Sequence, residues 1–409
     1  MSTRITTEIL GVVPVLSGVT TEQEVSASWI RGGDGLIGFG KFINKKVSGP
    51  TRFAEASTWW REVRSQFSIE NNVHGSGTGP ILFSSFSFDE SEESELLIPE
   101  IIVGRKGDKA WITWIGDGPQ PKLGSLISVA SHPTVSYSQG GLSDEAWMGR
   151  VEEAVSRIKS GELEKIVLAR DSVIHSDKSI DIARLLQSLE SEYPSTWIFL
   201  VENLIGATPE LLVRLSKSLV TSRVLAGTIR KTGDEARDLS LAGSLAKSSK
   251  DLEEHEYAVR SVAEALAPYC SSTNVPDSPF VLHLANVMHL ATDVTGVVNE
   301  TATPTDIFTL LSALHPSAAV CGTPTEKAKL AIKELEGMSR GRYAGPVGWI
   351  DARGDGELGI ALRCGLINEG RDGARIFAGC GIVAGSNPAD ELAESQAKLI
   401  PMRTALATL

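Results

Sequence analysis

Short apolar runs recur through the first 140 residues, and this pattern predicts strands. The runs GLIGFGKF and GPILFSSFSF are bounded by Gly, Pro and Ser residues, which is typical of strands that end in turns. The stretch FAEASTWWREVRSQF has helical spacing instead. The segment Gly75–Pro80, GSGTGP, lacks the Lys-Ser/Thr ending of a phosphate loop and runs into a strand. We therefore interpret it as a tight turn.

Helical and strand-like segments are interspersed in the rest of the chain. Ser143 precedes apolar residues at helical spacing, and Gly161 marks the end of that helix. A strand follows, with Lys165 at its start. The segment LIGATPE is interpreted as a turn, and the polar stretch Asp234–Ser249 as a mobile segment. Because most strands are joined by hairpin-like turns, the pattern predicts an α+β protein whose antiparallel sheets are covered by helices.

Near the C-terminus, two apolar runs flank the turn EGRDG and predict an antiparallel hairpin. Arg363 is expected on a strand of this region. A glycine-spaced loop with Gly379, Gly381 and Gly385 is expected behind the second run. Its backbone N–H groups and the Arg363 guanidinium could bind an anion.

The segment after this loop carries a strong helix-start signal. Asn387 is suited to cap the helix and Pro388 to its first position. Glu391, Glu394 and Lys398 then fall three and four residues apart, which places them on one helical face. Such a face could hold a metal, although the spacing alone favours a solvated row of charges.

Composition limits the classes of function. The chain has 409 residues, 42% hydrophobic residues and a net charge of −12, which argues against binding to nucleic acid or to an anionic membrane surface. Four cysteines without CxxC spacing indicate buried thiols in a reducing compartment. The N-terminus makes a poor signal peptide, and no apolar stretch is long enough to span a membrane. We expect a soluble cytoplasmic protein of enzyme size.

Several polar residues stand where a core would exclude them. Lys165 interrupts an apolar strand, Glu210 follows Pro209 before a buried run, and His289 lies in a strand-like stretch. Glu254 begins a helix that is otherwise apolar on one face. Each has an ordinary alternative: a snorkelling lysine, a turn-exposed carboxylate, a core histidine or a solvated acidic patch. None of these residues identifies a site alone.

Eight segments together carry more information than any one of them. In chain order they are GATPELL, LAGT, SKDLEEH, HLAT, HPSAAVCG, YAGPVGW, ALRCGLI and FAGCGIVAGSNPADELAESQAKL. From about Ser143 onward, the chain resembles the chorismate-utilising enzymes, which include isochorismate, salicylate, anthranilate and aminodeoxychorismate synthases. The resemblance implies two packed antiparallel sheets with helices outside and the active site in a cleft between them. It implies a catalytic part at residues 141–409 and a looser N-terminal half at 1–140, with few functional residues, in one continuous unit.

The resemblance also implies the residues of the site. Glu254 and Glu394 would ligate Mg²⁺, and Glu391 would contribute directly or through water. Arg363 would bind the enolpyruvyl carboxylate of chorismate with Tyr343 nearby. The remaining substrate contacts would come from Gly227, Thr228, His289, Gly379, Gly381 and Lys398.

Lys165 decides the branch of the family in this comparison. A lysine at its position marks the members that add water to the ring, whereas aminodeoxychorismate synthases carry a lysine where this chain has Ala226. Hydroxyl exchange needs a base to deprotonate water at C2 and an acid to protonate the hydroxyl that leaves C4. Lys165 and Glu210 are expected to take these roles. Glu210 then requires a pKa raised from its usual value of about 4.3.

The sequence therefore predicts an Mg²⁺-dependent isochorismate synthase that serves menaquinone or siderophore synthesis. A salicylate synthase, which adds a pyruvate-eliminating step, is the nearest alternative. Further alternatives are an anthranilate or aminodeoxychorismate synthase component, a subunit that only binds chorismate, and a Mg²⁺-dependent phosphotransferase, which would lack a phosphate loop. Besides chorismate we expect no nucleic-acid or membrane partner, and we expect a monomer.

Overall fold

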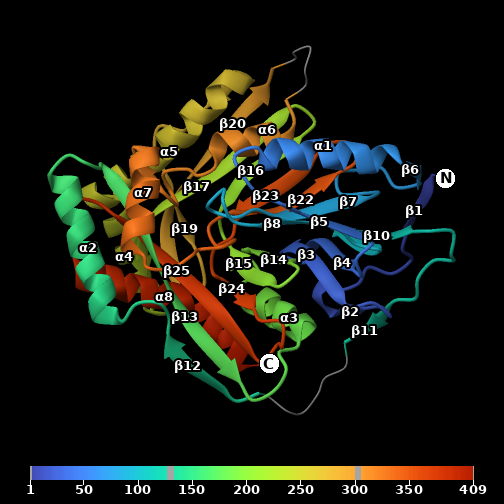
Figure 1. The fold of residues 1–409 in the computed structure, drawn as a ribbon, viewed down its shortest axis with the longest axis horizontal. Coiled ribbons are helices and arrows are strands. Elements are labelled where there is room, and N and C mark those ends of the chain that lie inside the picture. The colour runs from blue at the N-terminus through green and yellow to red at the C-terminus, as the bar shows by residue number, and fades with distance from the viewer. Residues whose placement is uncertain (1, 127–132, 300–304, 409) are drawn as a thin grey trace.

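Two large β-sheets form the body of the molecule (Figure 1). A computed structural model describes residues 2–126, 133–299 and 305–408. In this part of the chain the first sheet has 13 strands and the second has 10, and a separate two-stranded sheet lies apart from both. The expected architecture of two packed sheets with helices outside is confirmed.

The first sheet has this spatial order: β12 (Val135–Gln139), β13 (Lys165–Ser176), β25 (Gly373–Ile382), β24 (Cys364–Ile367), β15 (Leu204–Thr208), β14 (Trp197–Val201), β3 (Val25–Arg31), β4 (Asp34–Phe39), β9 (Ile101–Lys106), β10 (Lys109–Ile115), β1 (Thr3–Ile9) and β6 (Phe67–Asn71), with β21 (Gly322–Thr323) paired to β13. The second has the order β18 (Cys270–Asn274), β20 (Val287–Val298), β17 (Leu219–Arg230), β16 (Leu211–Ser216), β23 (Gly356–Ile360), β22 (Pro346–Asp351), β7 (Ile81–Ser85), β8 (Ser94–Ile98) and β5 (Ile43–Val47), with β19 (Phe280–His283) paired to β20. The small sheet pairs β2 (Val19–Thr20) with β11 (Gly124–Ser125). The helices are α1 (Arg52–Ser65), α2 (Asp144–Lys159), α3 (Ile182–Glu192), α4 (Glu235–Leu245), α5 (Ser249–Leu266), α6 (Ile307–Leu314), α7 (Thr325–Leu335) and α8 (Pro388–Ala407).

The neighbouring strands are antiparallel, as the hairpin-like turns predicted, with one exception among the described strands: β1 and β6 run parallel. Helices cover the sheets from outside. Helix α5 packs against β17 and β20 of the second sheet, and α8 packs against β25 of the first (Figure 1). The two helices that carry the predicted metal ligands are thus attached to different sheets.

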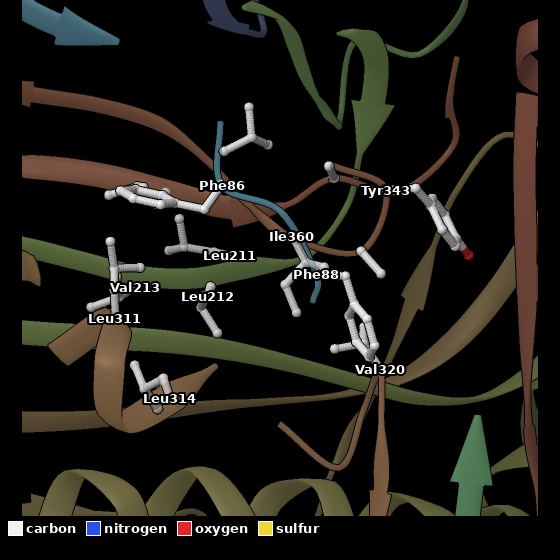
Figure 2. Close-up of a cluster of buried hydrophobic side chains, with 14 of the residues drawn as sticks. Phe86, Phe88, Leu211, Leu212, Val213, Leu311, Leu314, Val320, Tyr343 and Ile360 are labelled. Carbon is white, nitrogen blue, oxygen red and sulfur yellow. The ribbon is translucent and has the colours of Figure 1, made fainter. Parts of the chain in front are cut away.

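Strand β14 shows how the core is built. Trp197, Phe199 and Val201 belong to the large buried cluster that the two sheets share, whereas Ile198 and Leu200 belong to a second cluster on the other face of the strand. Side chains alternate between the faces of a strand, so a continuous apolar run serves both clusters. Figure 2 shows part of the large cluster, in which side chains from β16 pack against those of α6.

Local helix signals are confirmed where they were strongest. The Ser143 hydroxyl accepts a hydrogen bond from Ala146 N at 3.2 Å at the start of α2. The Asn387 side chain accepts from Ala389 N at 2.9 Å at the start of α8. All but the last two residues of the stretch FAEASTWWREVRSQF lie in α1, which ends at Ser65. These caps satisfy backbone donors that a helix leaves unpaired at its first turn.

Three predictions of local structure were wrong, in addition to the placement of Arg363 on a strand. Most of LIGATPE, interpreted as a turn, is strand β15, which pairs with strands on both sides. The polar stretch Asp234–Ser249 contains α4, whose first turn is capped by the Asp234 carboxylate. Gly379 and Gly381 lie in strand β25, paired with β13, and not in a loop. In each case tertiary pairing decided a segment whose composition resembled a turn or a loop.

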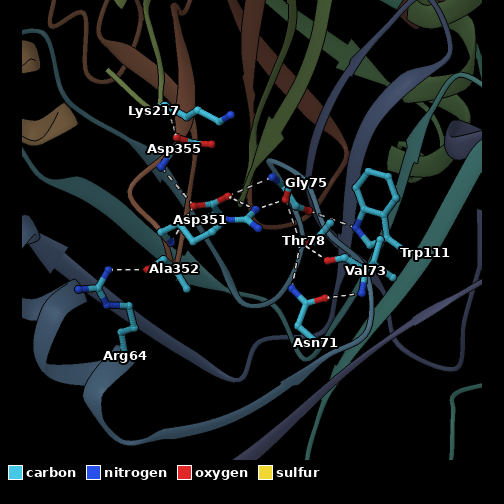
Figure 3. A network of polar contacts seen from close by, with 12 residues as sticks. Arg64, Asn71, Val73, Gly75, Thr78, Trp111, Lys217, Asp351, Ala352 and Asp355 are labelled. Atoms are coloured by element: carbon cyan, nitrogen blue, oxygen red, sulfur yellow. Dashed lines mark hydrogen bonds and ion pairs between the residues drawn. The ribbon is translucent and has the colours of Figure 1, made fainter. Parts of the chain in front are cut away.

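Hydrogen bonds from other residues of the chain and within the turn stabilise the Gly75–Pro80 turn (Figure 3). The Thr78 hydroxyl lies 2.9 Å from Gly75 O within the turn and 3.0 Å from Val73 O just before it, and can donate to either. The buried Asp351 carboxylate accepts from Gly77 N at 3.1 Å. A backbone donor that a phosphate loop would offer to its ligand is thus bonded internally, in agreement with the interpretation as a structural turn.

Both sheets contain strands from either side of residue 140. Strand β3 pairs with β14 in the first sheet, and β7 pairs with β22 in the second. The division at that residue stays a prediction. None of the helices in the described residues combines the length and the apolar character that a membrane crossing requires.

Candidate active site

A cavity lies between the two sheets at the end where α5 and α8 approach each other. It is lined from the first sheet by residues of β13 and β25, and from the second by residues of β17 and β20. Most of the predicted site residues line it: Glu210, Gly227, Thr228, Glu254, His289, Tyr343, Arg363, Gly379, Gly381 and Lys398. An adjoining cavity is lined by all three predicted metal ligands, Glu254, Glu391 and Glu394.

Lys165 is the first residue of β13 and its side chain is fully buried. Its ammonium lies 3.4 Å from Glu254 Oε1, but it makes no hydrogen bond of good geometry. The lysine stands behind Glu254 and not on the wall of the main cavity among the described lining residues. Gly381 makes this contact possible, because a Cβ there would lie 1.9 Å from Glu254 Oε1 and 3.2 Å from Lys165 Cε.

Glu210 lies where the chain crosses from β15 in the first sheet to β16 in the second. Its side chain is buried, and burial raises its pKa to about 7 although the positive charges of Arg363 and Lys165 act in the opposite direction. The carboxyl group is therefore substantially protonated near neutral pH. The pKa that the acid role requires is thus present, and its physical cause is desolvation.

Arg363 lies at the neighbouring crossover, between β23 in the second sheet and β24 in the first, and not on a strand as expected. Its backbone has a φ of 47°, a left-handed conformation that a non-glycine residue adopts only where the surroundings impose it. The two crossovers are bonded to each other, since Ile360 N donates to Glu210 O at 3.2 Å. The pair of neighbouring crossovers thus places both the Glu210 carboxyl group and the Arg363 guanidinium at the cavity.

His289 connects the guanidinium to the second sheet. Arg363 Nη2 lies 2.8 Å from His289 Nε2, and the Thr228 hydroxyl lies 3.0 Å from His289 Nδ1. A guanidinium can only donate, so Nε2 accepts and the proton is assigned to Nδ1. Burial, followed by the charges of Arg363 and Lys398, holds the pKa of His289 well below its usual range. The imidazole is therefore neutral and keeps the guanidinium in place.

Tyr343 forms another part of the wall. Its ring stacks on Phe377 with centroids 5.0 Å apart, and its hydroxyl approaches Gly379, where an added Cβ would lie 3.0 Å away. Tyr343, Arg363 and Gly379 thus line the same cavity, and their contact with substrate stays a prediction.

Each of the predicted metal ligands has a lysine partner. Lys398 Nζ donates to Glu394 Oε1 at 2.6 Å, one helical turn away on α8. Lys250 Nζ, on α5, donates to Glu391 Oε1 at 2.7 Å, and Lys165 approaches Glu254 as described above. Glu391, Glu394 and the Cys380 thiol offer ligand atoms that all lie within 4.8 Å of one another.

An ion pair that sequence reasoning missed supports the strand with Lys165. Glu336 and Arg340 are buried and bonded to each other. Glu336 Oε1 accepts from Ala169 N at 2.7 Å, and Arg340 Nη2 donates to Val167 O at 2.9 Å. The pair takes the place of a neighbouring strand at this edge of β13. Its spacing of four residues is common on solvated helices, so the sequence carried no distinct signal for it.

The bonds of this pair to Val167 and Ala169 show in which direction the backbone groups of the opposed glycines in β25 point. Val167 is opposite Gly381, and Ala169 is opposite Gly379. Val167 and Ala169 direct their backbone groups away from β25, and in an antiparallel ladder the opposed residues do the same. Gly379 and Gly381 therefore turn their N–H and C=O groups away from β13, and Lys398 Nζ donates to Gly379 O at 2.9 Å. The backbone N–H groups that the sequence predicted in a glycine-spaced loop therefore belong to strand β25.

Comparison with known proteins agrees with this geometry. The model of the chorismate binding enzyme family matches residues 5–115 and 126–407. An isochorismate synthase (MenF) of Bacillus subtilis is 34% identical over an alignment 407 residues long, and the match covers 91% of this chain and 85% of that protein. The chain belongs to the family of chorismate-binding enzymes.

Solved structures support the same grouping. A putative 2,3-dihydroxybenzoate-specific isochorismate synthase (DhbC) of Bacillus anthracis superposes with a TM-score of 0.78 at 32% identity, covering 94% of this chain and 96% of that one. The menaquinone-specific isochorismate synthase MenF of Escherichia coli has a TM-score of 0.80 at 22% identity, covering 99% and 95%, which shows the shared fold. These relatives are isochorismate synthases.

Proposed function

We propose that this protein is an isochorismate synthase that converts chorismate to isochorismate with Mg²⁺ as its cofactor. The observation that carries the proposal is a cavity wall that contains both a carboxyl group with a pKa of about 7, Glu210, and the carboxylate of Glu254, against which the fully buried lysine Lys165 lies at 3.4 Å. A hydroxyl exchange near neutral pH needs one group that gives a proton and one that takes a proton. We infer that isochorismate then serves menaquinone or siderophore synthesis.

In this proposal Glu210 is the acid. It protonates the hydroxyl that leaves C4, and the ring double bonds shift as water adds at C2. Lys165 is the base that takes a proton from that water, which it can do only when its amine is neutral and no longer engaged with Glu254. Arg363 holds the enolpyruvyl carboxylate with its planar fork. Lys398 and the backbone donors of β25 complete the binding of a doubly negative substrate.

The proposed metal ligands fit Mg²⁺. Burial and the neighbouring charge of Glu394 raise the pKa of Glu391, so a cation at this place would relieve the repulsion between the two carboxylates. Burial raises the pKa of the Cys380 thiol well above its usual range, so the thiol stays protonated and is a poor ligand. The donors that remain are carboxylate oxygens, which suit a hard cation. When bound, Mg²⁺ would supply positive charge for a substrate carboxylate.

The expected product distinguishes this function from its alternatives. Chorismate incubated with the protein and Mg²⁺ should yield isochorismate, and isochorismate should yield chorismate, because moving one hydroxyl group changes little bond energy. Products are resolved by chromatography. Salicylate and pyruvate formed in step with chorismate loss would establish a salicylate synthase instead. Anthranilate formed with ammonia would contradict the branch assignment, and bound but unchanged chorismate would establish a binding subunit.

Turnover should depend on pH through Glu210. An acid must be protonated to act, and burial places the pKa of this group at about 7. The fraction of Glu210 that can donate a proton falls as pH rises through that value, whereas the fraction of Lys165 that can accept one rises, so kcat should follow a bell-shaped profile with one inflection near pH 7. The measurement is kcat at saturating chorismate and Mg²⁺ across about pH 6 to 9. A profile without an inflection near pH 7 would contradict the acid role.

A further inference from the structure

The three lysine–carboxylate pairs of the site are not equivalent. The side chain of Lys165 is fully buried and that of Lys398 is 11% exposed, whereas that of Lys250 is 36% exposed. The proposed mechanism gives Lys165 and Lys398 a role but leaves Lys250 without one. Its partner Glu391 is only 2% exposed and is the most enclosed of the three predicted metal ligands.

Lys250 is placed to share a cavity with the metal ligands. It lies in the first turn of α5, four residues before Glu254, so the two side chains project from one face of the helix. Lys250, Glu254, Glu391 and Glu394 all line the adjoining cavity. Arg230, Asp251 and Asp390 are the other charged residues of its described wall. The Lys250 ammonium thus stands within the group of oxygens that would surround a divalent cation.

A buried carboxylate needs a positive partner, because an unpaired charge away from water is costly. For Glu391 that partner is the Lys250 ammonium, at 2.7 Å from Oε1. A divalent cation bound to the same oxygen would have to displace the ammonium. The exposed part of the Lys250 side chain offers a route, since the ammonium can swing into water while α5 stays in place.

We propose that Lys250 is the resident counter-ion of Glu391 in the metal-free protein and that it competes with Mg²⁺ for this carboxylate. This inference rests on the proposed metal site and adds a regulatory role for a residue outside the set expected to contact substrate. Competition of this kind is reciprocal: the ammonium weakens metal binding by the factor by which the metal weakens the ion pair. The lysine therefore sets the Mg²⁺ concentration at which the site fills.

The test is the affinity for Mg²⁺ without substrate, measured by titration calorimetry on the full chain. Lys250→Met removes the competitor and leaves Glu391 in need of a cation, so Mg²⁺ should bind about tenfold more tightly than to the wild type. The metal-free variant should melt at a lower temperature and should gain more from added Mg²⁺. Lys250→Arg keeps the charge and should bind Mg²⁺ like the wild type.

A lysine taken from another ion pair controls for the loss of one positive charge. Lys333→Met removes the partner of Asp89, which lies 3.0 Å away at the surface, and should leave the Mg²⁺ affinity unchanged. Lys250→Gln serves as a second neutral variant if Lys250→Met does not fold. Equal or weaker Mg²⁺ binding by the neutral Lys250 variants would overturn the inference and leave the metal site standing. If the wild type binds no Mg²⁺, both the site and the inference are wrong.

Discussion

Lys165→Ala should lower the turnover of chorismate by about 10²-fold or more, while chorismate binding weakens far less. The lysine is fully buried at the start of β13, 3.4 Å from Glu254 Oε1. Its removal leaves the proposed attack at C2 without a base, whereas Arg363 and Lys398 still bind the substrate carboxylates. The measurement is kcat and KM from the chromatographic assay. Lys329→Ala, which removes a surface lysine paired with Glu326, should retain wild-type values.

Glu210→Gln should produce a loss of similar size for the complementary reason. Glutamine keeps the shape of the buried side chain but has no acidic proton to give to the hydroxyl that leaves C4. Far-ultraviolet circular dichroism should show that both variants are folded. A Lys165→Ala protein that forms isochorismate at close to the wild-type rate would remove the base assignment, and with it the main reason for the water-adding branch.

Replacing a proposed metal ligand should abolish most activity. Glu254→Gln and Glu394→Gln each preserve volume and remove a negative charge that Mg²⁺ requires. The variants should lose turnover, and their Mg²⁺ affinity by calorimetry should fall as well. Glu253→Gln is the matched control, because Glu253 precedes Glu254 on α5 but is exposed. That variant should behave like the wild type.

Chelation tests the same site without mutation. Excess EDTA should stop turnover by the wild type, and added Mg²⁺ should restore it. Full turnover in EDTA, with no metal added, would disprove the requirement for a cation. Loss of turnover in Glu394→Gln with unchanged Mg²⁺ affinity would instead assign Glu394 to the positioning of Lys398, its partner at 2.6 Å.

Local signals in the sequence were sufficient for several elements of the site. Ser143 and Asn387 cap α2 and α8 as predicted, because a cap depends on the few residues around it. The same holds for Glu394 and Lys398, whose spacing of one helical turn already places them in contact. Local patterns failed for β15 and for Gly379 in β25. Glycine and short apolar runs suit turns and buried strands equally, and only the neighbouring strands decide between them.

The sequence by itself determined the starts of α2 and α8, the antiparallel architecture and, through its resemblance to a family, the set of residues expected at the site. The tertiary structure decided how these residues work together. Glu210 and Arg363 meet because two neighbouring crossovers between the sheets are bonded to each other. Lys250 reaches Glu391 across 141 positions of sequence. Such contacts depend on how the sheets and helices pack, and the raised pKa of Glu210 follows from the burial that this packing imposes.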